Sequence, residues 1–320
     1  MSKGLVTVFG GSGFVGRYVV RALCRDGWRV RVALRRPHTA QDLKVMGKTG
    51  QVQLVQANIR FPDSIQSAAE GADAVVNLVA VLFEEGKQSF EALHVTGSAA
   101  VAEAAARANI SNVVQISAIG ADSDSESAYA RTKAHGEAAV LAHVPTADIM
   151  RPSIIFGAED RFFNRFAAMS QIAPALPLMG GGSTKFQPAY VGDVADAIAK
   201  ALSQGTTGSI YELGGPRTYS FKELMSFMLE TTGRKRFLAP VPWFAASALG
   251  FIGEITGKLP FVAPFLTRDQ VVSLKSDNIV ADDAKGFAEL GIQTETIEAI
   301  VPAYMERYRK YGQFYEPASH

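Results

Sequence analysis

The stretch GGSGFVG, from Gly10 to Gly16, decides the fold that we expect for this chain. Glycine recurs in it at every third position, and it lies between a β-rich run, Leu5 to Phe9, and an apolar helical pattern that ends at Gly27. Such glycines let the backbone approach a pyrophosphate, which rests on the amides at the start of the helix. The loop predicts a dinucleotide site, and a purely structural glycine turn is the alternative.

The alternation of strand and helix continues beyond this first unit. Further strands are expected at residues 29–34, 52–56, 74–78 and 113–117, with helical segments such as 89–108 between them. Strands that alternate with helices form a parallel sheet with right-handed crossovers. We therefore predict an α/β fold, a Rossmann-type doubly wound parallel sheet with a smaller C-terminal substrate lobe.

Arg151 and Pro152 interrupt an apolar stretch at residues 147–156, and the chain is expected to leave the sheet there for a second region. Beyond it the connections become rich in proline and glycine, as in APALPLMGGG at residues 173–182. We expect an NADP(H)-binding domain over residues 1–156 and a smaller mixed lobe for substrate or partner over residues 157–320. The chain is expected to return to the first domain near residues 184–215.

The end of the second expected strand carries positive charge. Arg35 and Arg36 stand where NAD-selective folds place an acidic group for the ribose 2′-hydroxyl. Guanidinium groups bind phosphate, so we predict NADP(H) in preference to NAD(H), with Arg17 as a further candidate. In the alternative interpretation Arg17 and Arg36 are only solvated surface charges. Asn58 and Ile59, after the third strand, are expected near the adenine edge.

The segment YARTK places Tyr129 and Lys133 on one face of an expected helix. The ammonium group lowers the pKa of the phenol and can also reach a ribose hydroxyl. Such a pair can pass a proton to or from a substrate oxygen while a hydride moves at nicotinamide. Tyr129 and Lys133 are therefore candidate catalytic residues, and otherwise they serve only to bind the cofactor.

The composition argues against several other classes of protein. A net charge of +1 gives no basic field for nucleic acid, and five histidines show no metal-binding spacing. The single cysteine, Cys24, is expected to be a buried, inert thiol in a reducing compartment. No apolar run approaches the roughly 20 residues that span a bilayer, and the first strand begins too close to Met1 for a signal peptide. We expect a cytoplasmic protein without a transmembrane segment.

Three motifs together resemble the extended and atypical short-chain dehydrogenase/reductase superfamily: GGSGFVG, YARTK, and RPSIIFG at residues 151–157. The resemblance covers almost the whole chain. In active relatives a serine or threonine, two residues past the first serine at the end of the fifth strand, orients the substrate oxygen. Here Ser117 matches the first serine, but Ile119 occupies the catalytic position. The serines that could substitute, none in the expected register, are Ser117, Ser123, Ser125 and Ser127.

Within that superfamily the chain is most similar to the nucleotide-binding accessory subunit of respiratory complex I and its bacterial homologues. The segments that carry this similarity are NIRFPDSI at 58–65, SAIGADSDSESAYARTKAHGE at 117–137, FQPAYVGDVADAI at 186–198 and LTRDQVVSLKSDNIV at 266–280. The resemblance implies an NADPH that is held as a structural or regulatory ligand. It also implies binding to the peripheral-arm subunits, at the cytoplasmic face of the inner membrane in a bacterium.

Two alternatives stay open beside this preferred interpretation. The first is a working NADP(H)-dependent reductase, epimerase or dehydratase that acts on a small polar or quinone-like substrate, with Tyr129 as acid/base and Lys133 as its electrostatic partner. Ile119 argues against it. The second is a redox sensor that docks to a partner through the apolar stretch after Pro240.

The predicted cofactor site draws residues from the end of every strand in the expected sheet. Family analogy adds the residues that follow the sixth strand, near the nicotinamide. The full set is Gly10, Gly11, Ser12, Gly13, Phe14, Val15, Gly16, Arg17, Arg35, Arg36, Asn58, Ile59, Leu78, Val79, Ala80, Ser117, Tyr129, Lys133, Pro152, Ile154 and Ile155.

Three further features are expected to be structural. Asp193 is predicted to be the N-cap of a helix. Few basic residues flank the aromatic segment at 240–265, so we favour internal packing of that segment over docking. The aromatic residues expected to pack internally are Phe162, Phe163, Phe166, Trp243, Phe244, Phe251, Phe261 and Phe265.

Overall fold

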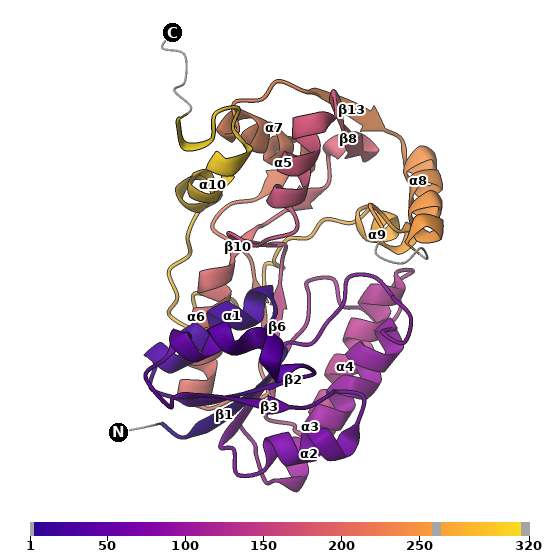
Figure 1. The fold of residues 1–320 in the computed structure, drawn as a ribbon. Helices are drawn as coiled ribbons and strands as arrows, with labels where there is room; N and C mark the ends of the chain where they lie inside the picture. Colours follow the sequence, from indigo (N-terminus) through magenta and orange to yellow (C-terminus); the bar gives the residue numbers. More distant parts are fainter. Residues whose placement is uncertain (1–2, 258–263, 315–320) are drawn as a thin grey trace. The chain divides into compact units, whose positions relative to one another are not determined.

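A computed structural model describes residues 3–257 and 264–314 (Figure 1). Phe261, one of the aromatic residues expected to pack internally, lies outside the described residues. The chain divides into two compact units. The first comprises residues 1–152, 191–213 and 281–293, and the second comprises residues 153–190, 214–280 and 294–320.

The first unit is built on a sheet of seven strands in the order β11-β6-β5-β4-β1-β2-β3, and every neighbouring pair is parallel. Their bounds are β1 Leu5–Phe9, β2 Arg29–Leu34, β3 Val52–Gln56, β4 Ala74–Asn77, β5 Val113–Ile116, β6 Asp148–Pro152 and β11 Ile210–Leu213. The strand order reverses between β1 and β4, which is where ligands bind in such sheets. The predicted Rossmann-type fold is confirmed.

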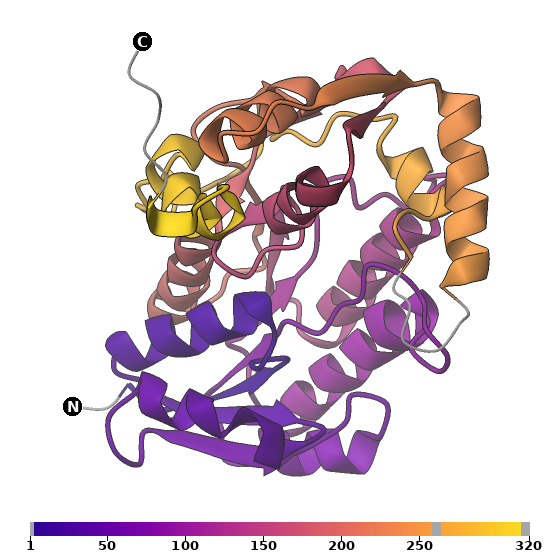
Figure 2. The ribbon, with the colours of Figure 1, turned by 45° about the horizontal axis from the view of Figure 1, so that its top comes forward.

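Helices cover both faces of this sheet (Figures 1 and 2). Helices α1 and α6 pack together on one face, and α2, α3 and α4 form a contiguous layer on the other. The bounds are α1 Phe14–Arg25, α2 Pro62–Ala69, α3 Gly97–Arg107, α4 Ala128–His143 and α6 Val191–Gln204, with a 3-10 segment at Pro37–Met46 and a π-helix at Glu91–Thr96. Because the strands are covered on both sides, β4 and β5 are buried along their whole length.

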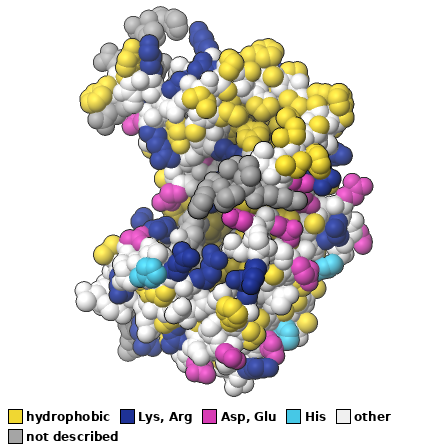
Figure 3. Space-filling model, turned by 45° about the vertical axis from the view of Figure 1, so that its right-hand side comes forward, with side chains coloured by type: hydrophobic (Ala, Val, Ile, Leu, Met, Phe, Trp, Pro, Cys, Tyr) yellow, Lys and Arg dark blue, Asp and Glu magenta, His cyan; other side chains and the backbone are white. Residues whose placement is uncertain are grey.

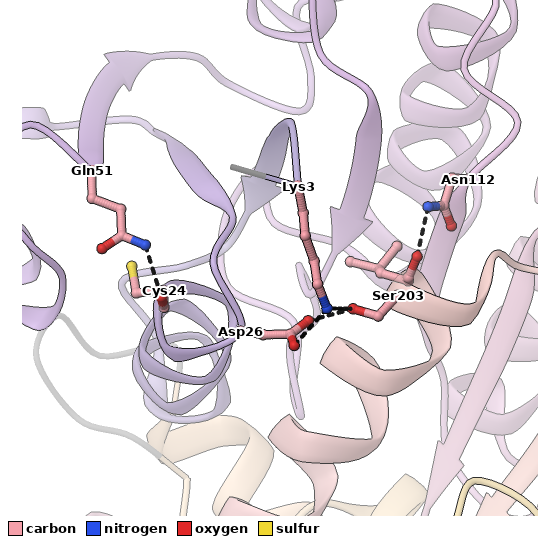
Figure 4. A network of polar contacts seen from close by, with 7 residues as sticks. Lys3, Cys24, Asp26, Gln51, Asn112 and Ser203 are labelled. Carbon is pink, nitrogen blue, oxygen red and sulfur yellow. Dashed lines mark hydrogen bonds and ion pairs between the residues drawn. The ribbon is translucent and has the colours of Figure 1, made fainter. Parts of the chain in front are cut away.

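Polar contacts fix the far end of α1 (Figure 4). The ammonium of Lys3 donates to Asp26 at 2.7 Å and to Ser203, near the end of α6, at 3.0 Å, and Gln51 Nε2 donates to the carbonyl of Cys24 at 2.7 Å. The Cys24 thiol is buried, and desolvation raises its pKa to about 11. The expectation of a buried, inert thiol is confirmed.

Of two local expectations in or beside the first unit, one is confirmed and one is wrong. The chain leaves the sheet where Arg151 and Pro152 stand, because β6 ends at Pro152, whose carbonyl still accepts a hydrogen bond from the Ile119 amide at 3.1 Å, and Ser153 begins the second unit. Asp193 is not an N-cap, because α6 already begins at Val191 and places Asp193 inside its first turn. There its carboxylate faces the positive end of the helix dipole.

The second unit combines three small two-stranded sheets with helices. The strand pairs are β7 Ile155–Phe156 with β10 Ala189–Tyr190, β9 Lys185–Phe186 with β12 Tyr219–Ser220, and β8 Ala175–Met179 with β13 Phe237–Val241. The helices are α5 Phe163–Ile172, α7 Phe221–Thr231, α8 Trp243–Thr256, α9 Arg268–Ser273 and α10 Ile297–Met305. Short 3-10 turns lie at Gly180–Gly182, Glu306–Tyr308 and Gly312–Phe314. Phe163 is fully buried, and the rings of Phe162 and Phe166 contact each other and Phe221. These three phenylalanines are core residues, as predicted.

Helix α8 does not pack as expected. Its buried face consists of small residues, and a Cβ atom at Gly253 would lie only 2.0 Å from the carbonyl oxygen of Leu266. Phe244 and Phe251 therefore turn outward, with exposed fractions of 80% and 50%, whereas Trp243 is half-buried and packs against the cluster around Met179, as predicted. Hydrophobic side chains gather on the face of the second unit that Figure 3 presents. Within the described residues, no helix is long and apolar enough to cross a membrane.

Candidate nucleotide site

The glycine loop is held by contacts that exclude side chains. Gly10 has a φ of +81°, and a Cβ atom on Gly16 would lie 2.3 Å from the Gly10 carbonyl oxygen. A Cβ atom on Gly11 would lie 2.6 Å from Val32 in β2. Helix α1 therefore begins directly against the end of β1, which is the close approach that a dinucleotide loop requires.

The start of α1 is suited to an anion. Gly13 precedes the first helical residue, and neither a side-chain cap nor an acidic residue occupies the first turn, which includes Phe14, Val15 and Gly16. The first amides of a helix have no partners inside the helix and carry the positive end of its dipole. Ser12 lies in the turn just before them. The geometry fits a pyrophosphate at this point.

The end of β4 runs beside this loop. A Cβ atom on Gly10 would lie 3.1 Å from the carbonyl carbon of Leu78, and the Leu78 amide donates to Phe9 at 2.9 Å. Leu78 and Val79 are half-buried, and Ala80 is exposed. The structure thus brings these three predicted residues to the carboxyl ends of β1 and β4, where the strand order reverses.

A cavity of about 350 Å³ opens at the ends of β2 and β3. Its lining residues are Arg35, Gln56, Ala57, Asn58, Phe61 and Ser64. The Arg35 guanidinium is its one charged group, and it donates to Gln88 Oε1 at 3.2 Å. Arg36 is exposed, whereas Arg17 forms an ion pair with Asp42. Of the three predicted arginines, Arg35 is the one that lines the cavity.

Asn58 is held in a defined orientation inside this cavity. Its side-chain Oδ1 accepts from the backbone amide of Arg60 at 3.1 Å, and its backbone amide donates to Ser64 Oγ at 3.0 Å. Because Oδ1 is occupied, Nδ2 is the group of this side chain that can donate to a ligand such as the ring nitrogens of adenine. Ile59 is 7% exposed and packs against Gly97, so it belongs to the core.

Tyr129 and Lys133 lie on α4, as their spacing predicts. The Lys133 Nζ atom is 5.9 Å from the centre of the Tyr129 ring and donates to the carbonyl of Ile116 at 3.4 Å. Burial lowers the pKa of Lys133 to about 8, against the attraction of Glu137, which raises it. Glu137 is itself bound by Arg151 at 2.6 Å. Lys133 can therefore exchange a proton close to neutral pH.

Ser117 carries a buried hydroxyl with no hydrogen-bond partner among the described residues. Buried polar groups are rarely left in this state, so the Ser117 hydroxyl is available for a hydrogen bond to a ligand. Ser127 caps α4 through Ala130, and Ser125 accepts from the Ser127 amide, so both are used structurally. Ile119 is half-buried and offers no hydroxyl.

His94 was not anticipated from the sequence. It lies in the π-helix, where it is 2% exposed, and its ring meets the Tyr129 ring at 5.4 Å between centroids. Nε2 accepts from the Val81 amide and Nδ1 lies beside Thr132 Oγ1, each at 3.2 Å. Burial, assisted by Lys133, lowers the pKa of His94 to about 3. A neutral histidine thus links the loop after β4 to the helix that carries Tyr129.

The remaining predicted residues lie around the end of β6. Pro152 is the last residue of that strand and of the first segment of the first unit. Ile154 and Ile155 belong to the second unit, where Ile154 packs against the aromatic core and its carbonyl accepts from the Ala189 amide at 2.9 Å. Their contact with nicotinamide stays a prediction. Among the described residues, no group of side chains is arranged to hold a metal ion.

Comparison with known proteins agrees with this geometry. The model of the NAD dependent epimerase/dehydratase family matches residues 6–214. The chain is 35% identical to the mitochondrial NADH dehydrogenase (ubiquinone) 1 alpha subcomplex subunit 9 of Arabidopsis thaliana, over 96% of this chain and 79% of the relative. It is 31% identical to a ceramide reductase of Caulobacter vibrioides, over 75% and 74% of the two chains.

Solved structures show the same fold. An NADPH-dependent quinone oxidoreductase of Escherichia coli, solved with NADPH, has a TM-score of 0.73 and 20% sequence identity, over 94% of this chain and 99% of the other. The similarity to the accessory subunit of complex I, inferred from the motifs, is confirmed.

Proposed function

Because this chain belongs to the NAD-dependent epimerase/dehydratase family, we propose that it holds NADP(H) as a structural or regulatory ligand, as an accessory subunit of respiratory complex I. The observation that carries the choice of NADP(H) is the cavity at the ends of β2 and β3. Its one charged lining residue is Arg35, and no carboxylate lines it. A ribose 2′-phosphate binds to a guanidinium, whereas a 2′-hydroxyl is selected by an acidic side chain.

The other parts of the site support the same ligand. The start of α1 would hold the pyrophosphate, Asn58 would bind the adenine edge, and the Ser117 hydroxyl would gain the partner that it lacks within the described residues. The bound nicotinamide would supply or accept a hydride. Lys133 and Tyr129 would orient its ribose.

Ile119 favours retention of the cofactor over turnover. A hydroxyl at this position would hold a substrate oxygen next to the phenol of Tyr129, and an isoleucine side chain cannot form that hydrogen bond. The role in complex I rests on the relative from Arabidopsis thaliana, which is named as a subunit of NADH dehydrogenase. We propose binding to the peripheral arm of that complex, beside the membrane and on its cytoplasmic side in a bacterium.

The nucleotide itself is the first thing to measure. The purified protein is denatured, the released nucleotide is identified, and its oxidation state is followed after quinones or carbonyl compounds have been added to the native protein. We expect NADPH that stays reduced. Recovery of NAD(H), or of no nucleotide, would contradict the proposal.

A matched pair of variants tests the role of Arg35. Arg35→Ala should weaken NADPH at least tenfold while NADH binding changes by less than about twofold, since one charge-assisted contact is worth more than 1.4 kcal/mol. The control is Arg29→Ala, which removes an equal charge from the opposite end of β2. Equal losses of affinity for NADPH and NADH would show that Arg35 does not bind the 2′-phosphate.

An NADPH-dependent reductase is the second candidate. The arrangement of Lys133 and Tyr129 favours it, as does the Ser117 hydroxyl, which has no hydrogen-bond partner among the described residues. The ceramide reductase among the relatives is consistent with it. In this case Tyr129 passes a proton to a carbonyl oxygen, and the ammonium of Lys133 stabilises the phenolate that remains. NADPH oxidation that Tyr129→Phe abolishes, with nucleotide affinity unchanged, would establish this function in place of the first.

A further inference from the structure

We infer that Arg60 is a second arginine for the 2′-phosphate, and that a hairpin at residues 85–88 competes with that phosphate for both Arg35 and Arg60. The inference rests on the proposed binding of NADP(H) and adds a residue that determines its specificity. It concerns the first unit alone.

The hairpin is a closed turn between β4 and the π-helix. The backbones of Glu85 and Gln88 exchange two hydrogen bonds, of 3.2 and 2.9 Å, and Gly86 has a φ of +56° that lets the chain turn. The carboxylate of Glu84 accepts from the Phe90 amide at 2.8 Å. The turn is therefore anchored at its base, and its tip consists of exposed residues.

Two arginines from different strands converge on this turn. Arg35 follows β2 and donates to the Gln88 side chain at 3.2 Å, and Arg60 follows β3 and donates to the Lys87 carbonyl at 3.4 Å. Their acceptors belong to consecutive residues, whose Cα atoms are only about 3.8 Å apart. Arg60 also lies between Asn58 and Phe61, which both line the cavity.

Neither arginine of this cluster is neutralised by direct contact. Within the described residues, Arg35 and Arg60 have no ion pair with a carboxylate, and the oxygens that they contact are neutral amides. Two guanidinium groups brought together repel each other. A phosphate relieves this repulsion, and its hydrogen bonds to arginine are about twice as strong as those of a neutral acceptor. A ribose phosphate in the cavity would thus displace the hairpin from both arginines.

The test compares two adenosine ligands that differ in the 2′-phosphate. Binding of 2′,5′-ADP and of 5′-AMP is measured by competition with NADPH, for the wild-type protein, Arg60→Ala, Arg35→Ala and Gln88→Ala. Arg60→Ala should weaken 2′,5′-ADP about tenfold and 5′-AMP less than about twofold. Gln88→Ala should tighten 2′,5′-ADP alone, because Arg35 loses its competing acceptor. Arg29→Ala is the control for the loss of charge.

Each outcome distinguishes this inference from the proposed function. If Arg35→Ala discriminates between the two ligands and Arg60→Ala does not, NADP(H) binding stands and the role of Arg60 is wrong. If Arg60→Ala weakens both ligands equally, Arg60 only supports the turn at Asn58, and the inference again fails. If neither variant discriminates, the preference for NADP(H) itself is wrong.

Discussion

At the scale of the residue, the buried polar groups around Tyr129 differ in whether they have partners. His94 is satisfied on both ring nitrogens, and Lys133 donates to a carbonyl. Of these three residues, Ser117 is the one whose side chain has no hydrogen-bond partner among the described residues. An unsatisfied buried group is costly until a ligand completes it, so Ser117 should affect binding and stability in opposite directions.

Ser117→Ala should leave the unfolding free energy of the nucleotide-free protein unchanged or raise it by about 1 kcal/mol, because the substitution removes an unpaired hydroxyl. It should weaken NADPH binding about fivefold. Urea unfolding and nucleotide titration measure the two effects. Ser123→Ala, in the exposed part of the same loop, is the matched control and should change neither. Lower stability with unchanged affinity would contradict a role in ligand binding.

His94 should make the protein sensitive to acid. Its pKa is about 3 when folded, against an ordinary value of 6.5 for histidine, so the unfolded chain binds the proton more readily. The stability that it contributes is present above pH 6.5 and is lost as the pH falls toward 3, by about 1.4 kcal/mol for each pH unit. His94→Gln should flatten the decline of the urea midpoint between pH 7 and 5. His38→Gln, an exposed histidine, should leave that slope unchanged, and an equal slope in all three proteins would refute the assignment.

At the scale of the element, the glycines at the junction of β1 and α1 have two different roles, one in packing and one in ligand binding. A Cβ atom on Gly16 would meet backbone at 2.3 Å, whereas one on Gly13 would lie 3.4 Å from the nearest atom. Gly16 is therefore needed for the helix to pack, and Gly13 leaves open the space that a pyrophosphate would occupy. Local spacing alone predicts both roles, because they depend on neighbouring residues.

Gly16→Ala should destabilise the protein by more than about 3 kcal/mol, since neither backbone segment can move away. Gly13→Ala should change stability by no more than about 1 kcal/mol and should still abolish NADPH binding. Thermal unfolding with and without NADPH distinguishes the two variants. Tight NADPH binding by Gly13→Ala would place the pyrophosphate elsewhere.

Local patterns predicted less where distant elements decide the structure. The strands β1 to β5 follow from short apolar runs between turns, and YARTK places Tyr129 and Lys133 on one helix face. The contact of Arg35 with Gln88 joins residues 53 positions apart, and the π-helix that carries His94 has no sequence period of its own. In helix α8 the expectation was wrong for Phe244 and Phe251, because the small residues Ala246, Gly250 and Gly253 form its buried face.

At the scale of the whole molecule, the first unit is assembled from three separate segments of the chain. The edge strand β11 pairs with β6, and α6 packs on α1, although both come from beyond residue 190. The alternation of strands and helices becomes irregular after residue 156, so the sequence does not fully reveal that later segments rejoin the first unit. The sheet and one of its helical faces are incomplete without it.

A chain shortened to residues 1–156 should therefore fail to form the nucleotide site stably. It would leave the edge of β6 unpaired and uncover the face of α1 that packs on α6, so we expect aggregation and no cooperative unfolding. Circular dichroism during heating, and NADPH titration beside the full chain, would measure this. Cooperative unfolding with full NADPH affinity would show that the first segment is sufficient.

The late pairing of β11 also has a consequence for the order of events during synthesis. Strand β6 ends at Pro152, and its partner ends at Leu213, 61 residues later. A ribosome that adds about 5–20 residues each second needs roughly 3–12 seconds to make that distance. During this interval the newly made β6 presents an open hydrogen-bonding edge. The nascent chain is thus most vulnerable to mispairing with other chains before β11 has been made and the sheet that supports the glycine loop is complete.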